Sequence, residues 1–282
     1  MRLARAAPGQ AEPPARIVIE PGGRVLDWQE LWRFRDLFGI FALRDVKLRY
    51  RQTALGVIWV VLQPLAASLI FAVIFGVLAH LPSNGSPYLL FVFAAMLPWN
   101  LFSGGVQRAG NSLITDARLV TKVYFPRELI PLASAAAVVL DFAVAGVVML
   151  VLMVLYRAAF TPTLLAVVPL VLLALAITVG ASLFFSALNV YYRDFSYAMP
   201  FLLQIWLYAT PVVYASSLVP ERWRLLFGLN PMAGVIDGFR WAFLGGAFPL
   251  GSLAEATVVG GLMLLIGAYV FERVERSFAD VI

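Results

Sequence analysis

Six long apolar segments occupy most of this 282-residue sequence and limit what it can fold into. A helix needs about 20 apolar residues to cross the hydrocarbon core of a bilayer, and these segments approach or exceed that length. An outer-membrane barrel would instead show segments of about 10 residues with alternating polarity. The sequence therefore predicts an all-α membrane protein, with spans at 53–79, 87–106, 129–156, 163–190, 199–215 and 253–271.

Composition narrows the choice of function classes. With 62% hydrophobic and 13% charged residues, the chain has too little polar surface for an ordinary soluble domain. It has no cysteine, which excludes disulfides and thiolate metal sites. Its one histidine, His80, excludes multi-histidine metal sites and argues against a histidine-centred triad, so we interpret it as an ordinary interfacial residue.

The distribution of basic residues predicts the orientation of the spans. With six spans, both termini lie on one side of the membrane. If that side is the cytoplasm, 17 of the 21 Lys and Arg residues are cytoplasmic, and only Arg157, Arg222, Arg224 and Arg240 lie outside. This bias follows the positive-inside rule.

The N-terminal region reads as a tail followed by an amphipathic helix. Residues 1–26 are rich in Pro, Gly, Ala and Arg and lack the apolar region of a signal peptide, which indicates a mobile tail. From 27 to 42, aromatic and aliphatic side chains fall on one arc at 100° per residue, opposite Gln29, Arg33 and Asp36. We predict a helix lying flat at the membrane interface, and a helix packed on a partner subunit is the alternative. Arg44, Lys47, Arg49 and Arg51 then anchor the first span.

Helix breakers interrupt the pattern at membrane depth. Gln63-Pro64 and Pro98-Trp99-Asn100 place polar groups and prolines inside spans, where freed backbone groups need protein or cavity water as partners. The segment 216–252 is apolar around Asn230-Pro231 and is too long for a simple turn. It predicts two re-entrant helices, at 221–227 and 232–244, with a surface loop as the alternative.

Catalytic motifs are missing from the sequence. There is no Gly-Lys pair, which excludes a P-loop, and no G-x-S-x-G elbow, so any ATP that drives this protein is hydrolysed by another subunit. Asp141 is the one acidic residue deep inside a predicted span. A proton relay would need several such groups, so we favour a structural bond to a neighbouring helix or to an end of the interface helix.

A short polar segment separates the second and third spans. Its cap at Thr115 or Asp116 and its stop at Pro126 predict a helix that projects into the cytoplasm at 116–124. The segment offers exposed groups to a docking protein, although an exposed turn of helix would look similar. The docking residues that we predict are Asp116, Arg118, Lys122, Tyr124 and Arg127.

Four sequence segments carry a family resemblance. They are LRDVKLRYRQTALGVIWVVLQPL (43–65), LVTKVYFPRELIPLA (119–133), NVYYRDFSYAMPFLLQIWLYATPVVY (189–214) and NPMAGVIDGFRWAFLG (230–245). In this order they resemble the permease subunits of type-2 ABC exporters, most closely the branch that exports O-antigen polysaccharide or teichoic acid. The C-terminal FERVERSFADVI also fits this pattern.

The resemblance implies a homodimer bound to two nucleotide-binding subunits, which carry the ATP and Mg²⁺. It implies an interface helix at 27–42 that includes Trp28, Trp32, Arg33 and Phe38, and a coupling helix at 116–124. It further implies a bacterial inner-membrane location with cytoplasmic termini, a lipid-linked polysaccharide cargo, contact with membrane lipids and no nucleic-acid partner. A re-entrant pair at 220–244 would gate the periplasmic exit, with candidates Trp223, Asn230, Asp237, Arg240 and Trp241.

Aromatic side chains suit the wall of a glycan channel, because sugar C–H faces stack on rings without strong, register-fixing hydrogen bonds. An aromatic residue facing lipid would give the same pattern. The candidates are Phe71, Phe75, Trp99, Phe195, Tyr197, Phe201 and Tyr208. Functional alternatives are a same-family exporter of a drug, lipid, teichoic acid or capsule polymer, and an ATP-independent secondary transporter. A membrane enzyme is a more distant third.

Overall fold

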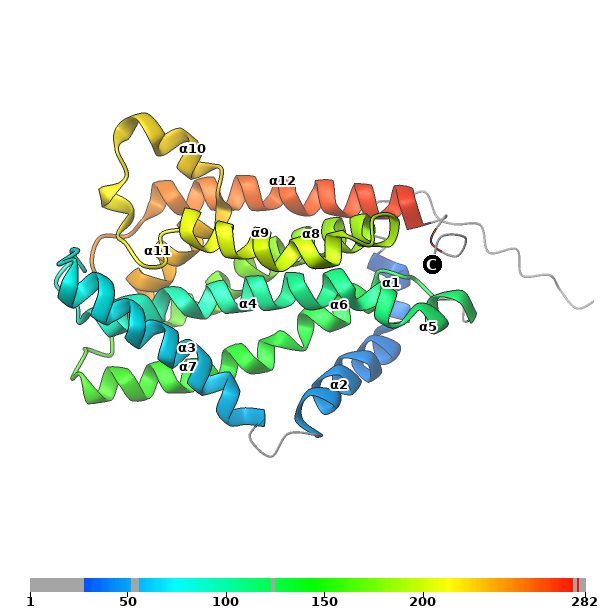
Figure 1. Cartoon of the computed structure of the whole chain (residues 1–282), viewed down its shortest axis with the longest axis horizontal. Coiled ribbons are helices and arrows are strands. Elements are labelled where there is room, and N and C mark those ends of the chain that lie inside the picture. The colour runs from blue at the N-terminus through cyan, green and yellow to red at the C-terminus, as the bar shows by residue number, and fades with distance from the viewer. Residues whose placement is uncertain (1–27, 52–55, 123–124, 276–277, 279–282) are drawn as a thin grey trace, which may run out of the picture.

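The computed structural model describes residues 28–51, 56–122, 125–275 and 278, and these residues form helices without any β-strand (Figure 1). The predicted all-α membrane fold is confirmed. The predicted tail at 1–26 lies outside the described residues.

In chain order the elements are α1 (Trp28–Arg33), α2 (Arg35–Arg51), α3 (Gly56–Phe71), the π-helix η1 (Ala72–Leu78), α4 (Tyr88–Thr115), α5 (Ala117–Lys122), α6 (Leu129–Ala136), α7 (Val138–Leu155), η2 (Pro162–Ala166), α8 (Val167–Tyr191), α9 (Phe195–Ala209), η3 (Ser216–Leu218), η4 (Glu221–Trp223), α10 (Arg224–Gly228), α11 (Pro231–Leu244) and α12 (Leu250–Glu275).

Five helical segments of the described chain are long and apolar enough to cross a membrane, and each overlaps a predicted span. The second continues beyond the predicted end at Val106 to Thr115, because its polar residues fall on one face and leave the other face apolar. The five segments are Ile58–Leu78, Tyr88–Thr115, Leu129–Leu155, Pro162–Tyr191 and Leu250–Glu275.

The sixth predicted span, 199–215, is only partly helical. Its helix α9 has 15 residues, which corresponds to about 22 Å of helix. The helix ends before Pro211 because the residue preceding a proline is disfavoured in the helical region, and Thr210 is extended with ψ 144°. Residues 210–215 continue in irregular conformation. A helix of this length followed by six non-helical residues still has the reach of a bilayer.

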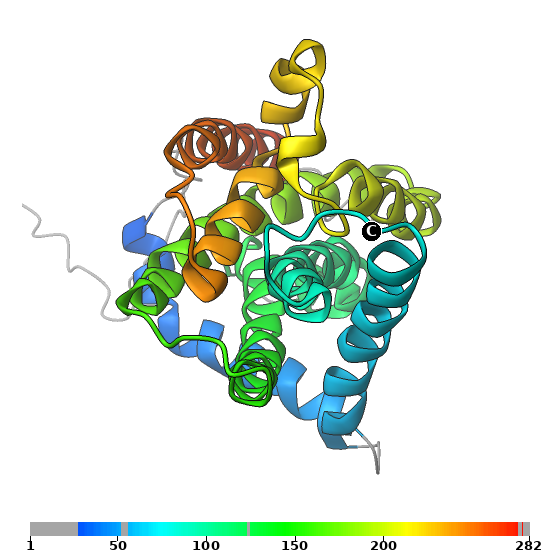
Figure 2. The same cartoon turned by 90° about the vertical axis from the view of Figure 1, so that its left-hand side faces the viewer.

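Helix α4 lies in the middle of the bundle, as the end-on view in Figure 2 shows. In an apolar stretch of 18 residues within α4, 78% of the residues are buried, whereas the corresponding value for the segment that contains α3 is 17%. The main core cluster joins α4 to the helices around it, and a second cluster at one end includes Phe41, Leu113 and Phe271. The outer faces of α3, α7 and α12 keep exposed leucine, valine and isoleucine side chains, as expected for surfaces that face lipid.

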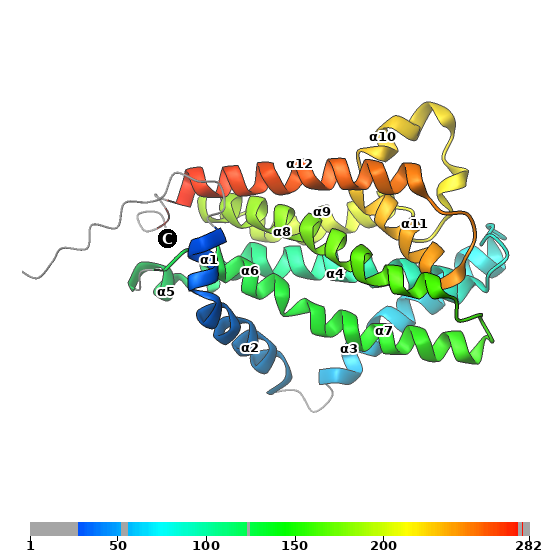
Figure 3. The same ribbon diagram turned by 180° about the vertical axis from the view of Figure 1, so that it is seen from behind.

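The N-terminal helix differs from the prediction of a single helix at 27–42. It is interrupted at Phe34 and continues as α2 to Arg51, since residues 43–51 are good helix formers and α2 has polar partners in the bundle. Figure 3 shows α1, α2 and α5 together at one end of the molecule, with α10 and α11 at the other. We call these the α5 end and the α10 end.

Candidate functional site

A cavity of about 840 Å³ lies between α2, α3, α4, α6 and α7. Its wall includes side chains from the interface helix and from three of the candidate spans, so residues far apart in the sequence converge there. Polar groups gather in it although the surrounding helices are strongly apolar. The charged residues of the wall are Arg44, Asp45, Arg49, Arg108, Asp116 and Asp141.

A polar stripe on α4 forms one side of this cavity. Asn100, Ser103, Gln107, Asn111 and Thr115 recur every three or four residues and therefore share one face of the helix. The stripe is about 22 Å long at 1.5 Å per residue. It connects the α5 end with the middle of the bundle.

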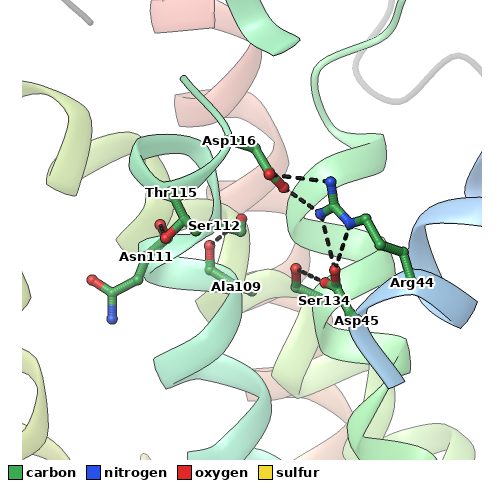
Figure 4. A network of polar contacts seen from close by, with 8 residues as sticks. All are labelled: Arg44, Asp45, Ala109, Asn111, Ser112, Thr115, Asp116 and Ser134. Atoms are coloured by element: carbon green, nitrogen blue, oxygen red, sulfur yellow. Dashed lines mark hydrogen bonds and ion pairs between the residues drawn. The ribbon is translucent and has the colours of Figure 1, made fainter. Parts of the chain in front are cut away.

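Arg44 on α2 bridges two carboxylates at the α5 end of the cavity (Figure 4). Its Nη1 donates to Asp116 Oδ1 at 3.1 Å, and its Nη2 donates to Asp45 Oδ1 at 2.9 Å and also to Asp116 Oδ2. Asp45 in turn accepts a hydrogen bond of 2.6 Å from Ser134 Oγ on α6. The network links α2 to α6 and to the junction between α4 and α5.

Electrostatics keep this arginine charged. Burial alone would lower the pKa of Arg44, but hydrogen bonds and Coulomb attraction from Asp116 and Asp45 outweigh it and raise the pKa above the ordinary value. The Asp116 side chain is only 16% exposed. Asp116, predicted as a docking residue, therefore engages α2 within the same chain.

Coupling energy between Arg44 and Asp116 is expected to reach about 1–3 kcal/mol in a double-mutant cycle, because the pair is partly buried and charge-assisted. The cycle compares Arg44→Ala, Asp116→Ala and the double variant by the free energy of unfolding in detergent. The exposed pair Arg35–Asp36, at 3.8 Å, is the control and should couple by less than about 0.5 kcal/mol. Additive effects at Arg44 and Asp116 would contradict the network.

Asp141 lies deeper in the cavity, about 18 Å along the helix from Leu129. Its Oδ2 forms an ion pair with Arg49 near the C-terminal end of α2, and a second one with Arg108 of α4 at 3.7 Å. The carboxylate is 13% exposed. A charge at this depth is retained when opposite charges surround it, and here the partners come from two different helices.

The other predicted docking residues occupy different surroundings. Arg118 is exposed on α5, the short helix that was predicted at 116–124. Arg127 is part-buried and binds Glu275 at the end of α12, its backbone N–H lying 3.3 Å from Glu275 Oε1 and its Nη1 donating to the Glu275 carbonyl. The Lys122 side chain and all of Tyr124 lie outside the described residues.

The predicted interface-helix residues do not all face the same way. Phe38 is part-buried against the second core cluster, whereas Trp32 is 70% exposed, with the Arg35 guanidinium 5.3 Å from its ring centroid. Arg33 is also exposed. The side chain of Trp28 lies outside the described part of the chain. The apolar arc is therefore divided between the bundle and the exterior.

The predicted channel aromatics fall into three settings. Trp99 is buried in the core, packed on Phe102 at 5.7 Å between ring centroids. Phe71, Phe75 and Phe195 are part-buried beside the core. Exposed rings occur on α9, at Tyr197, Phe201 and Tyr208.

Asn230 organises the start of α11. As N-cap it accepts a hydrogen bond from Met232 N at 3.2 Å, and Pro231 occupies the first helical position. Its Oδ1 also accepts from Trp206 Nε1 at 3.0 Å, and its Nδ2 donates to Thr210 Oγ1 at 2.8 Å. The cap of α11 thus holds the end of α9.

Arg240 holds the irregular segment that follows α9. It is 7% exposed, and its guanidinium donates to the carbonyls of Val212 at 2.8 Å, Tyr214 at 3.1 Å and Phe91 at 3.3 Å. The Tyr88 hydroxyl donates to the carbonyl between those of Val212 and Tyr214, that of Val213, at 2.5 Å. Irregular backbone needs such partners away from water.

We call the contacts of Arg240 with the carbonyls of Val212 and Tyr214 the Arg240 clamp. The remaining predicted gate residues lie in the neighbouring part of the chain. Asp237 accepts a 2.7 Å hydrogen bond from Ser216 Oγ, and burial raises the pKa of its carboxyl although Ser216 and Arg240 oppose the change. Trp241 is part-buried and packs on Phe248 at 4.8 Å between ring centroids. Trp223 is 51% exposed. Hence Asn230, Asp237 and Arg240 bind neighbouring segments, and Trp223 faces outward.

Sequence reasoning missed the polar stripe of α4 and the roles of Arg44 and Arg49, which it read as membrane anchors. The spacing of Asn100, Ser103, Gln107 and Asn111, at steps of three or four residues, was a usable signal. Nothing in the sequence paired Arg44 with Asp116, which is 72 residues away. Among the described residues, no group of three or more His, Cys, Asp or Glu side chains could hold a metal ion.

Comparison with known proteins adds independent information. The profile of the family described as ABC-2 type transporter matches residues 36–244. An O-antigen export system permease protein RfbA from Myxococcus xanthus is 32% identical over 261 residues, covering 90% of this chain and 98% of the relative. An RfbA from Klebsiella pneumoniae is 28% identical over 250 residues, with 88% and 95% covered. The polysialic acid transport protein KpsM of Escherichia coli is 22% identical over 239 residues, with 83% and 92% covered.

Proposed function

The chain belongs to the ABC-2 type transporter family, and from that premise we propose that it is the membrane-embedded subunit of an ATP-driven polysaccharide exporter. Its cargo is a lipid-linked, O-antigen-like polysaccharide that moves from the cytoplasm to the periplasm. The observation that carries this proposal is the 32% identity to an O-antigen export permease over 98% of that protein's length. Capsule transport is less well supported, since the KpsM relative is 22% identical.

The motor is a separate subunit in this proposal. Two ABC ATPase subunits bind ATP and Mg²⁺ and dock at the α5 end, which faces the cytoplasm of a bacterial inner membrane. The concentration of basic residues towards that end supports the orientation. Helix α5 is the coupling helix, and the Arg44–Asp116 contact carries its displacement to α2.

A second copy of the chain completes the pathway. The exposed rings of α9, Tyr197, Phe201 and Tyr208, suit a wall along which sugar faces slide, because stacking lacks the directionality of hydrogen bonds. The α10–α11 pair lies near the exit. Since Asn230 and Arg240 tie α11 to the end of α9, any gate movement displaces these two elements together.

Docking at the coupling segment predicted at 116–124 implies that the double variant Lys122→Ala, Tyr124→Ala co-purifies with much less ATPase than the unchanged chain, because two predicted docking side chains are removed. The matched control replaces a tyrosine and a cation at the opposite end, Tyr156→Ala with Arg157→Ala. The measurement is the ATPase-to-permease ratio after affinity purification. Equal ratios for both variants would reject α5 as the docking element.

A further inference from the structure

We propose that the cavity between α2, α3, α4, α6 and α7 is a sugar-binding site within each protomer, which takes a short uncharged stretch of the glycan at the cytoplasmic side. This inference rests on the proposed function and adds a second location for the cargo. The cavity wall includes no residue of α9, and the aromatics Phe71 and Phe75 of the first candidate span are absent from it as well. The site is therefore distinct from the aromatic channel wall.

Three amide side chains in the cavity have no protein partner within the described chain. Gln63 extends from α3, and Asn100 and Gln107 extend from the polar stripe of α4. Each amide offers two N–H donors and one acceptor oxygen. Polar groups at membrane depth are retained where they contact water or a polar ligand, because an unsatisfied group in hydrocarbon costs several kcal/mol.

Charge balance selects the ligand class. The wall carries three arginines and three aspartates, and they pair with one another through Arg44 with Asp45 and Asp116, and through Arg49 and Arg108 with Asp141. The wall therefore has no net positive charge to attract a phosphate or diphosphate. Sugar hydroxyls both donate and accept hydrogen bonds, which matches amides and paired charges that offer both functions.

Size and shape agree with a short oligosaccharide. A volume of about 840 Å³ falls within the range of about 300–1,000 Å³ seen for small-molecule sites. Besides its polar groups, the wall includes Gly104 of α4 and Phe142 of α7, and the Phe142 ring supplies an apolar surface. An aromatic ring next to amide groups is the combination that binds a sugar through its C–H face and its hydroxyls.

The test uses a photoreactive amino acid in the complete exporter, with the cell's own glycan as the probe. The variants Gln107→p-benzoylphenylalanine and Gln63→p-benzoylphenylalanine place the photophore on two different helices, α4 and α3, so a folding defect in one leaves the other informative. Leu262→p-benzoylphenylalanine, on the exposed face of α12, is the negative control. Phe201→p-benzoylphenylalanine reports on the proposed channel wall.

Light-dependent adducts that react with a glycan-specific antibody are expected when the photophore is at position 107 or 63. No such adduct is expected at position 262. Glycan adducts at Phe201 with none at either glutamine would overturn the sugar site and leave the exporter proposal intact. Phospholipid adducts at the glutamines in place of glycan would overturn it as well. Failure of the exporter proposal itself is scored separately, as surface glycan that persists after deletion of the chain.

Discussion

Replacing Gly267 with alanine is expected to lower the free energy of unfolding by about 3 kcal/mol, because there is no room for a methyl group at this position. A Cβ atom on Gly267 would lie 2.0 Å from the carbonyl oxygen of Gly180 on α8. The facing position on α8 is also crowded, since a Cβ on Gly180 would lie 2.6 Å from the Cα of Leu264 on α12. Both obstacles are backbone atoms, so α8 and α12 would have to separate.

Gly261→Ala is the matched control for this variant. It lies on the same helix, and a Cβ there meets nothing within 4 Å. Because alanine has the higher helix propensity, this control should be neutral or stabilising by up to about 1 kcal/mol. Thermal unfolding in detergent and the yield of monodisperse protein measure the difference. Equal stability of the two alanine variants would show that α8 and α12 are not in backbone contact.

Arg240→Met is expected to destabilise the protein by about 3–5 kcal/mol, because methionine fills part of the space and leaves the carbonyls of Val212 and Tyr214 without their donor. The stability of Arg240→Lys should lie between those of Arg240→Met and the unchanged protein, since an ammonium group lacks the planar fork that reaches three carbonyls. The measurement is again the free energy of unfolding in detergent.

Arg222→Met provides the control for the clamp. Arg222 lies at the same α10 end but is exposed, so its replacement should change stability by less than about 0.5 kcal/mol. Protease sensitivity between Thr210 and Ser216 is a local readout, and it should increase in Arg240→Met alone. A methionine variant as stable as Arg222→Met would contradict the assigned clamp.

Local rules were sufficient to predict most of the helices. Apolar length located five spans, and the helix predicted at 232–244 agrees closely with α11, whose start is fixed locally by the Asn230 cap and Pro231. The end of α9 was misplaced, although Pro211 marked it, because the apolar run continues through Val212 and Val213. There the irregular backbone depends on Arg240, which is remote in sequence.

The contacts of the candidate site were harder to predict from the sequence than the helices. Asp141 was recognised as unusual, but its partners Arg49 and Arg108 are separated from it along the chain and meet it only through packing. Trp99 was a channel candidate by residue type alone, and it is 4% exposed in the protomer. Residue type indicates which chemistry is possible, and the side of the helix that a residue occupies decides whether that chemistry is exposed.

Export of the glycan by intact cells tests the central claim most directly. Cells lacking this chain, and cells whose partner ATPase binds but does not hydrolyse ATP, are compared with the parent strain for polysaccharide at the cell surface. The account predicts that surface polysaccharide disappears in both strains, accumulates inside as lipid-linked polymer, and returns when the intact gene is restored. Undiminished surface polysaccharide in either strain would contradict it.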